Sequence, residues 1–353
     1  YMVNFFSHQP AINYGFNKVE YSWQHKVGSP EANKGKEFIE SVMDYWLNLG
    51  VDGFRVDMAD SLVKNDGNDK VETIKLWKSI RADLATKYPN FEMVSEWANP
   101  AQSLEAGFDS DFVLDHRGTC SHLLFRLDEY DSEAHTPLLM KYDEEVYNKF
   151  KTDLLKRLSE AKKLNKSLSF ISGNHDTLRI ANYLDDLALR QAYVFLLTMP
   201  GVPFIYAGDE IGTHSKPIPS VEGGFQRTGT RMPMRFDSTK NAGFSTANKT
   251  FLPTNEDDST VEEMEKDPTS LLHFIQKLIE IRNKESVLTS DEFELLDGNV
   301  LSYRRGNITV YINITNDIQT IQSEEKEILI ASGSFKQDGG KIALSPKSSI
   351  VIK

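Results

Sequence analysis

The chain has 353 residues, of which 39% are hydrophobic and 26% charged, and its formal net charge is -12 at pH 7. This length can form one large domain and a small one, and the sequence has no apolar run long enough to cross a bilayer. Nucleic-acid binding needs clustered Lys and Arg, so the acidic balance excludes a general phosphate-binding surface. The single cysteine, Cys120, excludes an intrachain disulfide and is expected to be a structural thiol.

Helices and short strands alternate as far as residue 286. Apolar spacing predicts helices at residues 33–49, 74–84, 143–162, 185–199 and 269–284. Strand-like runs lie at residues 51–58, 91–95, 112–114, 168–171 and 202–206. The acidic stretch at 255–266 is expected to be a solvated loop or insertion. Short strands that alternate with longer helices indicate βαβ units and a parallel sheet.

Polar clusters mark the ends of several strands, at residues 55–57, 95–97, 174–176 and 208–210. In a barrel, polar residues at the carboxyl ends of different strands meet on one face. No Gly-x-Gly-x-x-Gly follows these strands, which argues against a dinucleotide-binding open sheet. We therefore predict an α/β fold of the (β/α)8 TIM-barrel type.

The pattern changes at about residue 287. Short β-rich runs, such as residues 300–303 and 308–312, are separated by Asp-Gly, Arg-Gly and Gly-Gly turns. This pattern predicts a small antiparallel β-sandwich domain over residues 287–353.

The predicted strand ends supply three carboxylates, one histidine and one arginine. Cleaving an acetal requires protonation of the departing oxygen and stabilisation of an oxocarbenium-like transition state, and a pair of carboxyl groups can do both. The inventory therefore suits glycoside hydrolysis. A single Asp at a strand end is more often a cap or an ion-pair partner, so the order and spacing of the clusters carry the argument.

Four segments together resemble the α-amylase family. Residues 53–59 (Gly-Phe-Arg-Val-Asp-Met-Ala) are similar to the end of the family's fourth barrel strand, where an arginine precedes the nucleophilic aspartate by two positions. Residues 92–97 resemble the fifth-strand segment that ends in the acid/base glutamate. Residues 171–176 are similar to the seventh-strand segment with its His-Asp pair, and residues 201–210 resemble the eighth strand and its loop.

The resemblance implies a role for each carboxylate: Asp57 as nucleophile, Glu96 as general acid/base and Asp176 as the third carboxylate. Arg55 would hold Asp57 ionised, or would only anchor the strand as a plain ion pair. Glu96 must be protonated at the first step, so we expect its pKa to be raised. In a retaining enzyme the carboxyl groups of Asp57 and Glu96 would lie about 5 to 5.5 Å apart.

Three further residues are candidates for substrate binding. His175 and Asp176 would hydrogen-bond hydroxyls of a distorted sugar ring, although a lone histidine is more often structural. Trp97 could give apolar cover to Glu96, stack on a sugar or simply pack. Arg231 matches an arginine that helps close the pocket of exo-acting relatives, and its alternative is a surface or interface cation.

Arg231 belongs to a segment that narrows the subgroup. Residues 226–237 and 241–244 resemble the Arg-Thr-Pro-Met-Gln-Trp stretch of oligo-1,6-glucosidases, α-glucosidases and trehalose synthases, and residues 9–13 are similar to their Gln-Pro-Asp-Leu-Asn segment. The linkage preference stays open because four positions depart from these patterns: Ala11, Met232, Arg235 and Phe236.

The family's first segment, at the end of the third barrel strand, has no counterpart here. We therefore expect residues 1–32 to end the loop domain that follows that strand, and residues 33–286 to form about the last five βα units of the barrel. The N-terminal half of the barrel is expected from a longer protein, and the chain by itself is expected to have little activity. Localisation stays open, since any signal peptide would precede this sequence.

The predicted function is retaining hydrolysis of α-glucosidic bonds in an oligosaccharide or polysaccharide. One alternative is a transglycosylase or isomerase such as a trehalose synthase, in which a sugar and not water intercepts the glycosyl-enzyme. Another is a non-catalytic relative such as an amino-acid transporter heavy chain, although such relatives commonly lose carboxylates that this chain keeps. The chemistry requires no cofactor, and a structural Ca²⁺ of the family type could not be placed in this chain.

Overall fold

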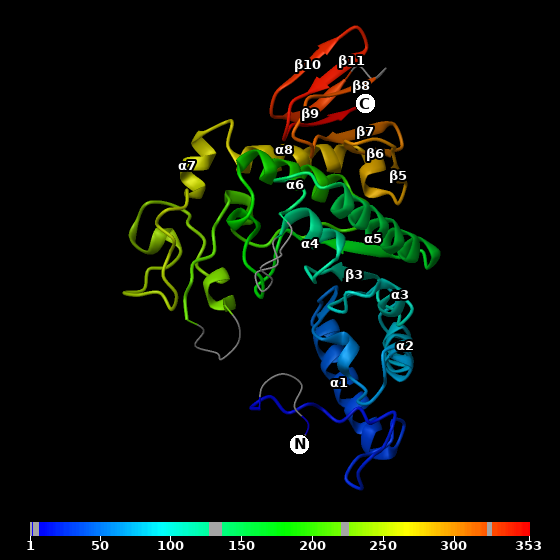
Figure 1. Cartoon of the computed structure of the whole chain (residues 1–353). Coiled ribbons are helices and arrows are strands. Elements are labelled where there is room, and N and C mark those ends of the chain that lie inside the picture. Colours follow the sequence, from blue (N-terminus) through cyan, green and yellow to red (C-terminus); the bar gives the residue numbers. More distant parts are fainter. Residues whose placement is uncertain (1, 3–6, 127–135, 220–225, 323–326) are drawn as a thin grey trace. The chain divides into compact units, whose positions relative to one another are not determined.

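The computed structural model describes residues 2, 7–126, 136–219, 226–322 and 327–353 (Figure 1). It divides the chain into two compact units. Unit 1 contains Tyr1–Phe112 with Lys156–Ser169, and unit 2 contains Val113–Leu155 with Phe170–Lys353. The domain boundaries at residues 32 and 286 stay predictions.

Unit 1 is built around a parallel sheet. Strands β1 (Gly53–Val56), β2 (Glu92–Ser95), β3 (Ser110–Val113) and β4 (Ser167–Phe170) lie in the order β1-β2-β3-β4. The pairs β1/β2 and β2/β3 are parallel. These strands confirm the first four strands that the sequence predicts, each with slightly different ends.

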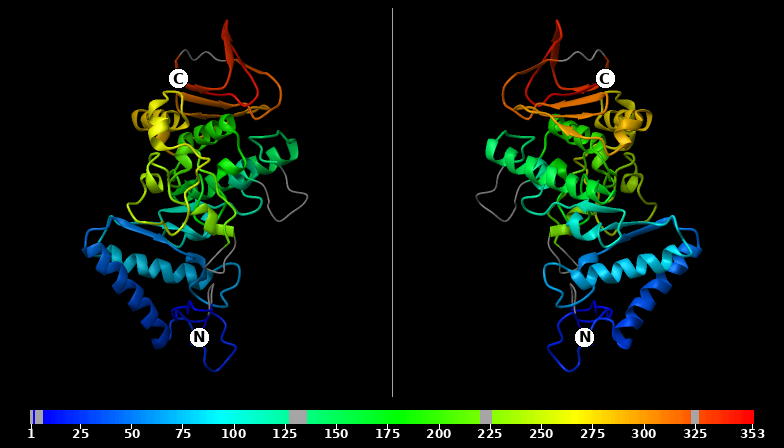
Figure 2. Two further views of the ribbon diagram at one scale, coloured as in Figure 1. Left: turned by 90° about the vertical axis from the view of Figure 1, so that its left-hand side faces the viewer. Right: turned by 90° about the vertical axis from the view of Figure 1, so that its right-hand side faces the viewer.

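Two helices cover one face of this sheet (Figure 2). They are α1 (Pro30–Asn48) and α2 (Val71–Ala85), and a short α3 (Pro100–Ser103) follows β2. Helix α1 begins where the sequence supplies a cap, because the Ser29 side chain accepts the Ala32 N–H and Pro30 takes the first helical position. These helices confirm the two helices predicted in this part of the sequence.

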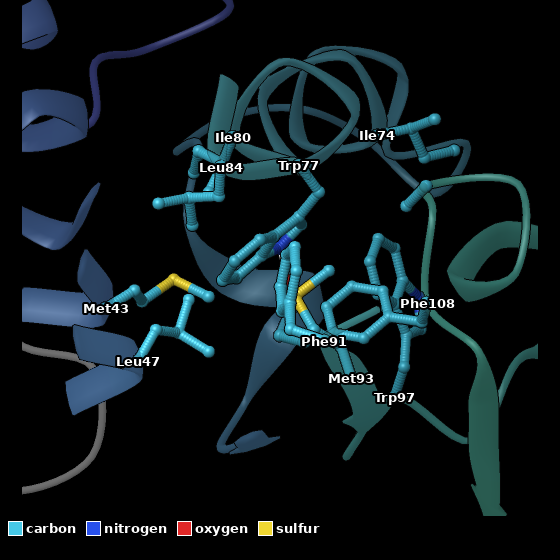
Figure 3. Close-up of a cluster of buried hydrophobic side chains, with 12 residues drawn as sticks. Met43, Leu47, Ile74, Trp77, Ile80, Leu84, Phe91, Met93, Trp97 and Phe108 are labelled. Atoms are coloured by element: carbon cyan, nitrogen blue, oxygen red, sulfur yellow. The ribbon is translucent and has the colours of Figure 1, made fainter. Parts of the chain in front are cut away.

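The core of unit 1 lies between the helices and the sheet (Figure 3). Ile80 of α2 is 0% exposed and Met93 of β2 is 1% exposed. Phe54 packs against the same cluster. Because side chains alternate across a strand, Arg55 points to the opposite face of the sheet from Phe54. The core thus orients β1 so that its polar residues face away from the helices.

Unit 2 contains α4 (Cys120–Phe125), α6 (Asp186–Thr198), α7 (Val261–Lys266) and α8 (Leu271–Lys284), and α5 (Glu144–Lys163) begins in it. Helix α6 packs on α8 and is buried along most of its length. Phe195 of α6 is the centre of an aromatic core, with ring contacts to Phe125, Phe150, Phe170 and Tyr303. The predicted helices at 143–162, 185–199 and 269–284 are confirmed.

Two predictions for unit 2 need correction. The strand expected at residues 202–206 is reduced to one parallel bridge between Ile171 and Phe204. The next N–H that faces the same strand, that of Tyr206, donates to the Ser172 hydroxyl at 2.9 Å and not to a main-chain carbonyl, so the ladder ends there. The acidic stretch is also not entirely loop, since its last residues form α7. Thr260 and Glu263 make a reciprocal capping box that begins this helix.

The C-terminal part of unit 2 is antiparallel, as predicted. One sheet has the order β5-β6-β7-β12-β9 and the other β10-β11-β8. A shared hydrophobic cluster includes Leu344 from the smaller sheet and Ile350 from the larger one. The strands are β5 (Glu294–Leu295), β6 (Leu301–Arg305), β7 (Ile308–Ile312), β8 (Gln319–Gln322), β9 (Ile328–Ser332), β10 (Phe335–Asp338), β11 (Lys341–Leu344) and β12 (Ser349–Ile352). No helix in the described part of the chain is both long and apolar enough to cross a membrane.

Candidate active site

Unit 1 brings together Arg55, Asp57 and Glu96. Asp57 follows the end of β1 and Glu96 follows the end of β2, and the carboxyl ends of neighbouring parallel strands meet at one edge of the sheet. Nη1 of Arg55 donates to Oδ1 of Asp57, and its Nη2 lies 2.8 Å from Oε1 of Glu96. One guanidinium therefore bridges the two carboxylates.

The two carboxylates have different environments. The Asp57 side chain is 70% exposed, whereas the Glu96 side chain is 17% exposed. Burial raises the pKa of Glu96, the Met58 N–H and the Arg55 cation oppose that rise, and the charge of Asp57 adds to it. The raised pKa confirms the expectation from the sequence. A buried carboxyl that holds a proton beside an exposed one can divide acid and nucleophile roles.

The main chain around the pair is ordered by both strands. The Glu96 N–H donates to the Val56 carbonyl at 3.0 Å, and the Glu96 carbonyl accepts the Ala59 N–H at 3.3 Å. Met58 has a φ of 41°, which is uncommon for a residue with a side chain. In this conformation its N–H donates to Oε2 of Glu96 at 3.0 Å. The turn after Asp57 thus holds the Glu96 carboxyl directly.

Trp97 lies in the core of unit 1 and is 8% exposed (Figure 3). Its ring meets Phe108 edge-on, with centroids 6.3 Å apart, and its indole N–H donates to Oε1 of Gln102 at 3.1 Å. These contacts favour the packing alternative over a sugar-stacking platform. A substrate contact by Trp97 stays a prediction.

Unit 2 brings together His175, Asp176 and Arg231, and it adds Arg227. Oδ1 of Asp176 accepts Nη1 of Arg227 at 2.8 Å and Nη2 of Arg231 at 3.1 Å. Nε2 of His175 lies 3.4 Å from Oδ2 of Asp176. The Arg231 Nε also donates to the His175 carbonyl at 2.9 Å. The third carboxylate is therefore surrounded by donors from two segments that are far apart in the sequence.

Arg227 was missed as a site residue by the sequence analysis, which considered only Arg231 in this segment. Arg227 lies in the 3-10 helix Gln226–Thr230, four positions before Arg231. In a 3-10 helix the side chains three positions apart share a face, so a spacing of four does not place these two arginines together. The spacing therefore gives no sequence signal for Arg227 as a second cation beside Asp176.

The loop that carries Asp176 is held by its own first residue. Oδ1 of Asn174 accepts the N–H of Asp176 at 2.8 Å and the N–H of Thr177 at 3.1 Å. A side-chain acceptor of this kind replaces a main-chain turn bond. Asn174 thus fixes the direction in which the chain presents His175 and Asp176.

A buried polar network lies beneath the same loop. Asp209 is 2% exposed, accepts Oγ of Ser172 at 2.7 Å and pairs with Nη1 of Arg179 at 2.6 Å. Burial raises the pKa of Asp209, and the Arg179 cation and the Ser172 hydroxyl oppose that rise. Nη2 of Arg126 adds a hydrogen bond to the Ser172 carbonyl at 3.0 Å. Asp209 therefore supports the strand end before Asn174 and is buried away from solvent.

The seven predicted site residues thus form two groups. Arg55, Asp57, Glu96 and Trp97 lie in unit 1, and the other three, His175, Asp176 and Arg231, lie in unit 2. Among the residues that the structure describes, no group of three or more His, Cys, Asp or Glu side chains is arranged to hold a metal ion.

Comparisons with known proteins identify the family. The α-amylase catalytic-domain family matches residues 10–291. Alpha-amylase 3 of Dictyoglomus thermophilum is 25% identical, with 100% of this chain and 65% of that protein covered. The salivary alpha-glucosidase of Aedes aegypti is 24% identical, with 89% of this chain and 58% of that protein covered. The chain thus spans less than two thirds of the length of these relatives.

Solved structures show the same fold. The trehalulose synthase MutB from Pseudomonas mesoacidophila MX-45 superposes with a TM-score of 0.74 over 93% of this chain and 71% of that one, at 20% identity. The likeness supports a TIM barrel followed by a C-terminal β domain. Because the family match extends over most of the sequence and includes every predicted catalytic carboxylate, the chain belongs to the α-amylase family.

Proposed function

We propose that the protein is a retaining glycoside hydrolase that cleaves α-glucosidic bonds, with Asp57 as nucleophile and Glu96 as general acid/base. The observation that carries the proposal is the Arg55 bridge between an exposed carboxylate and a buried one of raised pKa. A single guanidinium can contact both only if they are close, which suits the separation of about 5 to 5.5 Å in retaining enzymes.

The chemistry takes two steps. The Asp57 carboxylate attacks the anomeric carbon while Glu96 gives its proton to the departing glycosidic oxygen, so a glycosyl ester forms and an alcohol leaves. Glu96, now ionised, takes a proton from water, and that water attacks the same carbon. The sugar leaves with its original configuration, Asp57 returns to the carboxylate and Glu96 is protonated again.

Asp176 is the third carboxylate of the proposal. Its two arginine donors and the nearby His175 ring form a group that can hydrogen-bond sugar hydroxyls. Such contacts accelerate the reaction when they strengthen toward the transition state. Arg231 and His175 are the proposed substrate-binding residues on this side, and Trp97 is a weaker candidate because its ring is in the core.

The chain supplies about the last five βα units of the barrel in this proposal. Within the described residues β1 is an end strand of its sheet, and a barrel closes such edges. Helix α1 also leaves three large apolar side chains exposed, those of Phe38, Tyr45 and Trp46, and Leu49, the residue after the helix, is exposed as well. The upstream units of a longer protein would cover both surfaces.

No cofactor is needed for this chemistry, because both catalytic groups are carboxyls. A structural Ca²⁺ would take most of its ligands from the upstream part of a longer protein. The proposed substrates are α-glucans or short α-gluco-oligosaccharides.

A second candidate is a transglycosylase or isomerase of the same family. The likeness to a trehalulose synthase favours it, since that enzyme's name describes sugar transfer and not hydrolysis. Products from maltose separate the two: glucose alone supports hydrolysis, whereas trehalose or longer sugars support transfer. A non-catalytic relative is disfavoured because Asp57, Glu96 and Asp176 are all retained.

The test is turnover of a nitrophenyl α-glucoside by this chain with and without its upstream half. We expect activity with the upstream half and its loss in Asp57→Asn. Asp52→Asn is the matched control, because Asp52 is an exposed acid before the start of the same strand. Wild-type protein with the upstream half that turns over no α-glucoside would contradict the proposal. Full activity of the short chain would contradict the need for upstream units.

A further inference from the structure

Asp111 is a buried acid that the proposed reaction does not use. It lies in β3, is 0% exposed and is the register partner of Ser95 in β2. Oδ1 of Asp111 accepts the Ser95 hydroxyl at 2.6 Å and the Ala98 N–H at 3.3 Å. These two donors flank Glu96, one before it and one after it. A single carboxylate oxygen therefore holds both ends of the turn that carries the proposed acid/base.

The same turn is held on its other side by the chain after β1. The main chain of Glu96 is bonded to Val56 and Ala59, and its carboxyl is bonded to Arg55 and to the Met58 N–H. Removing the Asp111 side chain would take away the two hydrogen bonds through which β3 holds this turn. Proton transfer depends on placing the acid within hydrogen-bond reach of the leaving oxygen, so a small shift would be felt in the rate.

The local backbone gives the turn a reason to need this support. Ala98 has a φ of 60°, in the left-handed region that residues with side chains rarely adopt. Such a conformation persists where surrounding contacts over-determine it. The Asp111 bond to the Ala98 N–H is one such contact, and the Arg157 Nη1 bond to the Ala98 carbonyl at 3.1 Å is another.

The environment of Asp111 fits a hydrogen-bonding role more than an ion pair. Burial raises its pKa to about 6. The groups that oppose this rise are the hydroxyls of Ser95 and Ser103 and the N–H groups of Ala98 and Trp97. All four belong to the end of β2, the turn after it or α3.

We infer that Asp111 is a positioning residue for Glu96, fixing the turn at residues 95–98 so that the acid/base carboxyl stays in reach of the leaving oxygen. This inference rests on the proposed role of Glu96. A positioning role for Asp111 differs from a general structural role in one respect. Loss of Asp111 should slow cleavage of substrates whose leaving group needs a proton more than cleavage of substrates whose leaving group needs none.

The leaving group provides the readout. An α-linked disaccharide needs a proton on its departing alcohol, whereas α-glucosyl fluoride expels fluoride without one. In protein that includes the upstream half, we expect Asp111→Ala to lower kcat/KM on the disaccharide by about tenfold or more and on the fluoride by less than about threefold. Asp111→Asn keeps a carbonyl acceptor and should recover part of the loss.

Three further variants are needed to interpret the result. Asp109 lies just before β3 and pairs with Arg81 and Lys166. Asp109→Asn should lower turnover of both substrates equally. Ser95→Ala removes one contact while the buried carboxyl stays, and it gives the test if Asp111→Ala does not fold. Glu96→Gln gives the largest difference expected between the two substrates. It should abolish turnover of the disaccharide and reduce turnover of the fluoride much less.

The outcomes separate the two proposals. Unequal loss on the two substrates in Asp111→Ala or Ser95→Ala supports the positioning role. An equal loss of kcat/KM on the two substrates, or no loss, overturns the positioning role. Turnover by the wild type would still support the hydrolase proposal in that case. Wild-type protein that cleaves neither substrate overturns the hydrolase proposal and this inference with it.

Discussion

Arg55 and Glu96 are joined by a contact of 2.8 Å between Nη2 and Oε1, and the same guanidinium also donates to Asp57. The cation opposes the effect of burial on the pKa of Glu96. Arg55 thus affects the protonation of Glu96 in addition to holding the geometry of the pair.

Replacing Arg55 should move the pH profile. The cation lowers the pKa of Glu96, so Arg55→Met should raise that pKa further and keep Glu96 protonated to higher pH. The alkaline limb of the kcat/KM profile should therefore move to higher pH, and the maximum value of kcat/KM should fall. Arg81→Met is the control, because Arg81 pairs with Asp109 in the same unit. An alkaline limb that does not move in Arg55→Met would count against the acid role of Glu96.

Azide should distinguish the two catalytic carboxyls. In Asp57→Gly, azide can take the place of the nucleophile and attack an α-glucosyl substrate from the opposite face, so the product should be the β-azide. In Glu96→Ala, the glycosyl-enzyme still forms from an activated substrate and azide then attacks it, so the product should be the α-azide. Product NMR identifies the anomer. The same anomer from both variants would refute the assignment of roles.

The strands and helices were predictable where apolar periodicity is strong. The α1 and α2 helices and the strands before Asp57 and Glu96 lie where the sequence places them. The strand expected at residues 202–206 was overestimated, because an apolar run does not show that the Tyr206 N–H bonds to the Ser172 hydroxyl and not to a main-chain carbonyl. Helix α7 was missed, because its acidic composition concealed a capping box.

The candidate site was predictable only in part. Motif spacing identified Asp57, Glu96 and Asp176 but not the groups that support them. Asp111 lies just before the strand predicted at residues 112–114, and only the β2/β3 register places it beside Ser95. Arg227 contacts a carboxylate 51 positions earlier in the chain, a pairing that local periodicity does not encode.

Arg227 should contribute to turnover through Asp176. Arg227→Gln removes one of two charged donors to the same carboxylate oxygen, and we expect kcat/KM to fall about tenfold, at the low end for charged hydrogen bonds because Asp176 is partly exposed. Arg227→Lys keeps the charge and should lose less. Steady-state kinetics on a nitrophenyl α-glucoside gives the values. Wild-type kinetics in Arg227→Gln would exclude a functional role for this contact.

Metal removal should leave catalysis unchanged. The proposed steps use carboxyl groups only, so the protein with its upstream half should keep its kcat/KM after treatment with EDTA and gel filtration. A structural Ca²⁺ in the upstream half would show as a lower Tm after the same treatment, with activity kept below that temperature. Loss of activity in EDTA at a temperature where the fold is intact, restored by added Ca²⁺, would contradict the cofactor proposal.

The buried acid Asp111 should make stability depend on pH in a predictable direction. Burial raises its pKa from 3.8 to about 6, so the folded protein holds this proton more tightly than the unfolded chain. Its contribution to stability is therefore complete below about pH 4 and is lost as the pH rises through 6. Over that window the shift corresponds to about 3 kcal/mol at most.

Asp111→Asn cannot titrate and should lack this component. Urea midpoints of wild type and Asp111→Asn, measured between pH 4 and 7, give the difference in stability at each pH. The wild type should lose stability relative to the variant as the pH rises, and the change should level off above about pH 7. Asp109→Asn is the control: burial acts to raise the pKa of Asp109, but its contacts with Lys166, the Met93 N–H and Arg81 lower it overall, so its contribution is complete above about pH 4 and should stay constant over this window. A difference between wild type and Asp111→Asn that stays constant from pH 4 to 7 would show that Asp111 is not held in a buried, proton-binding state.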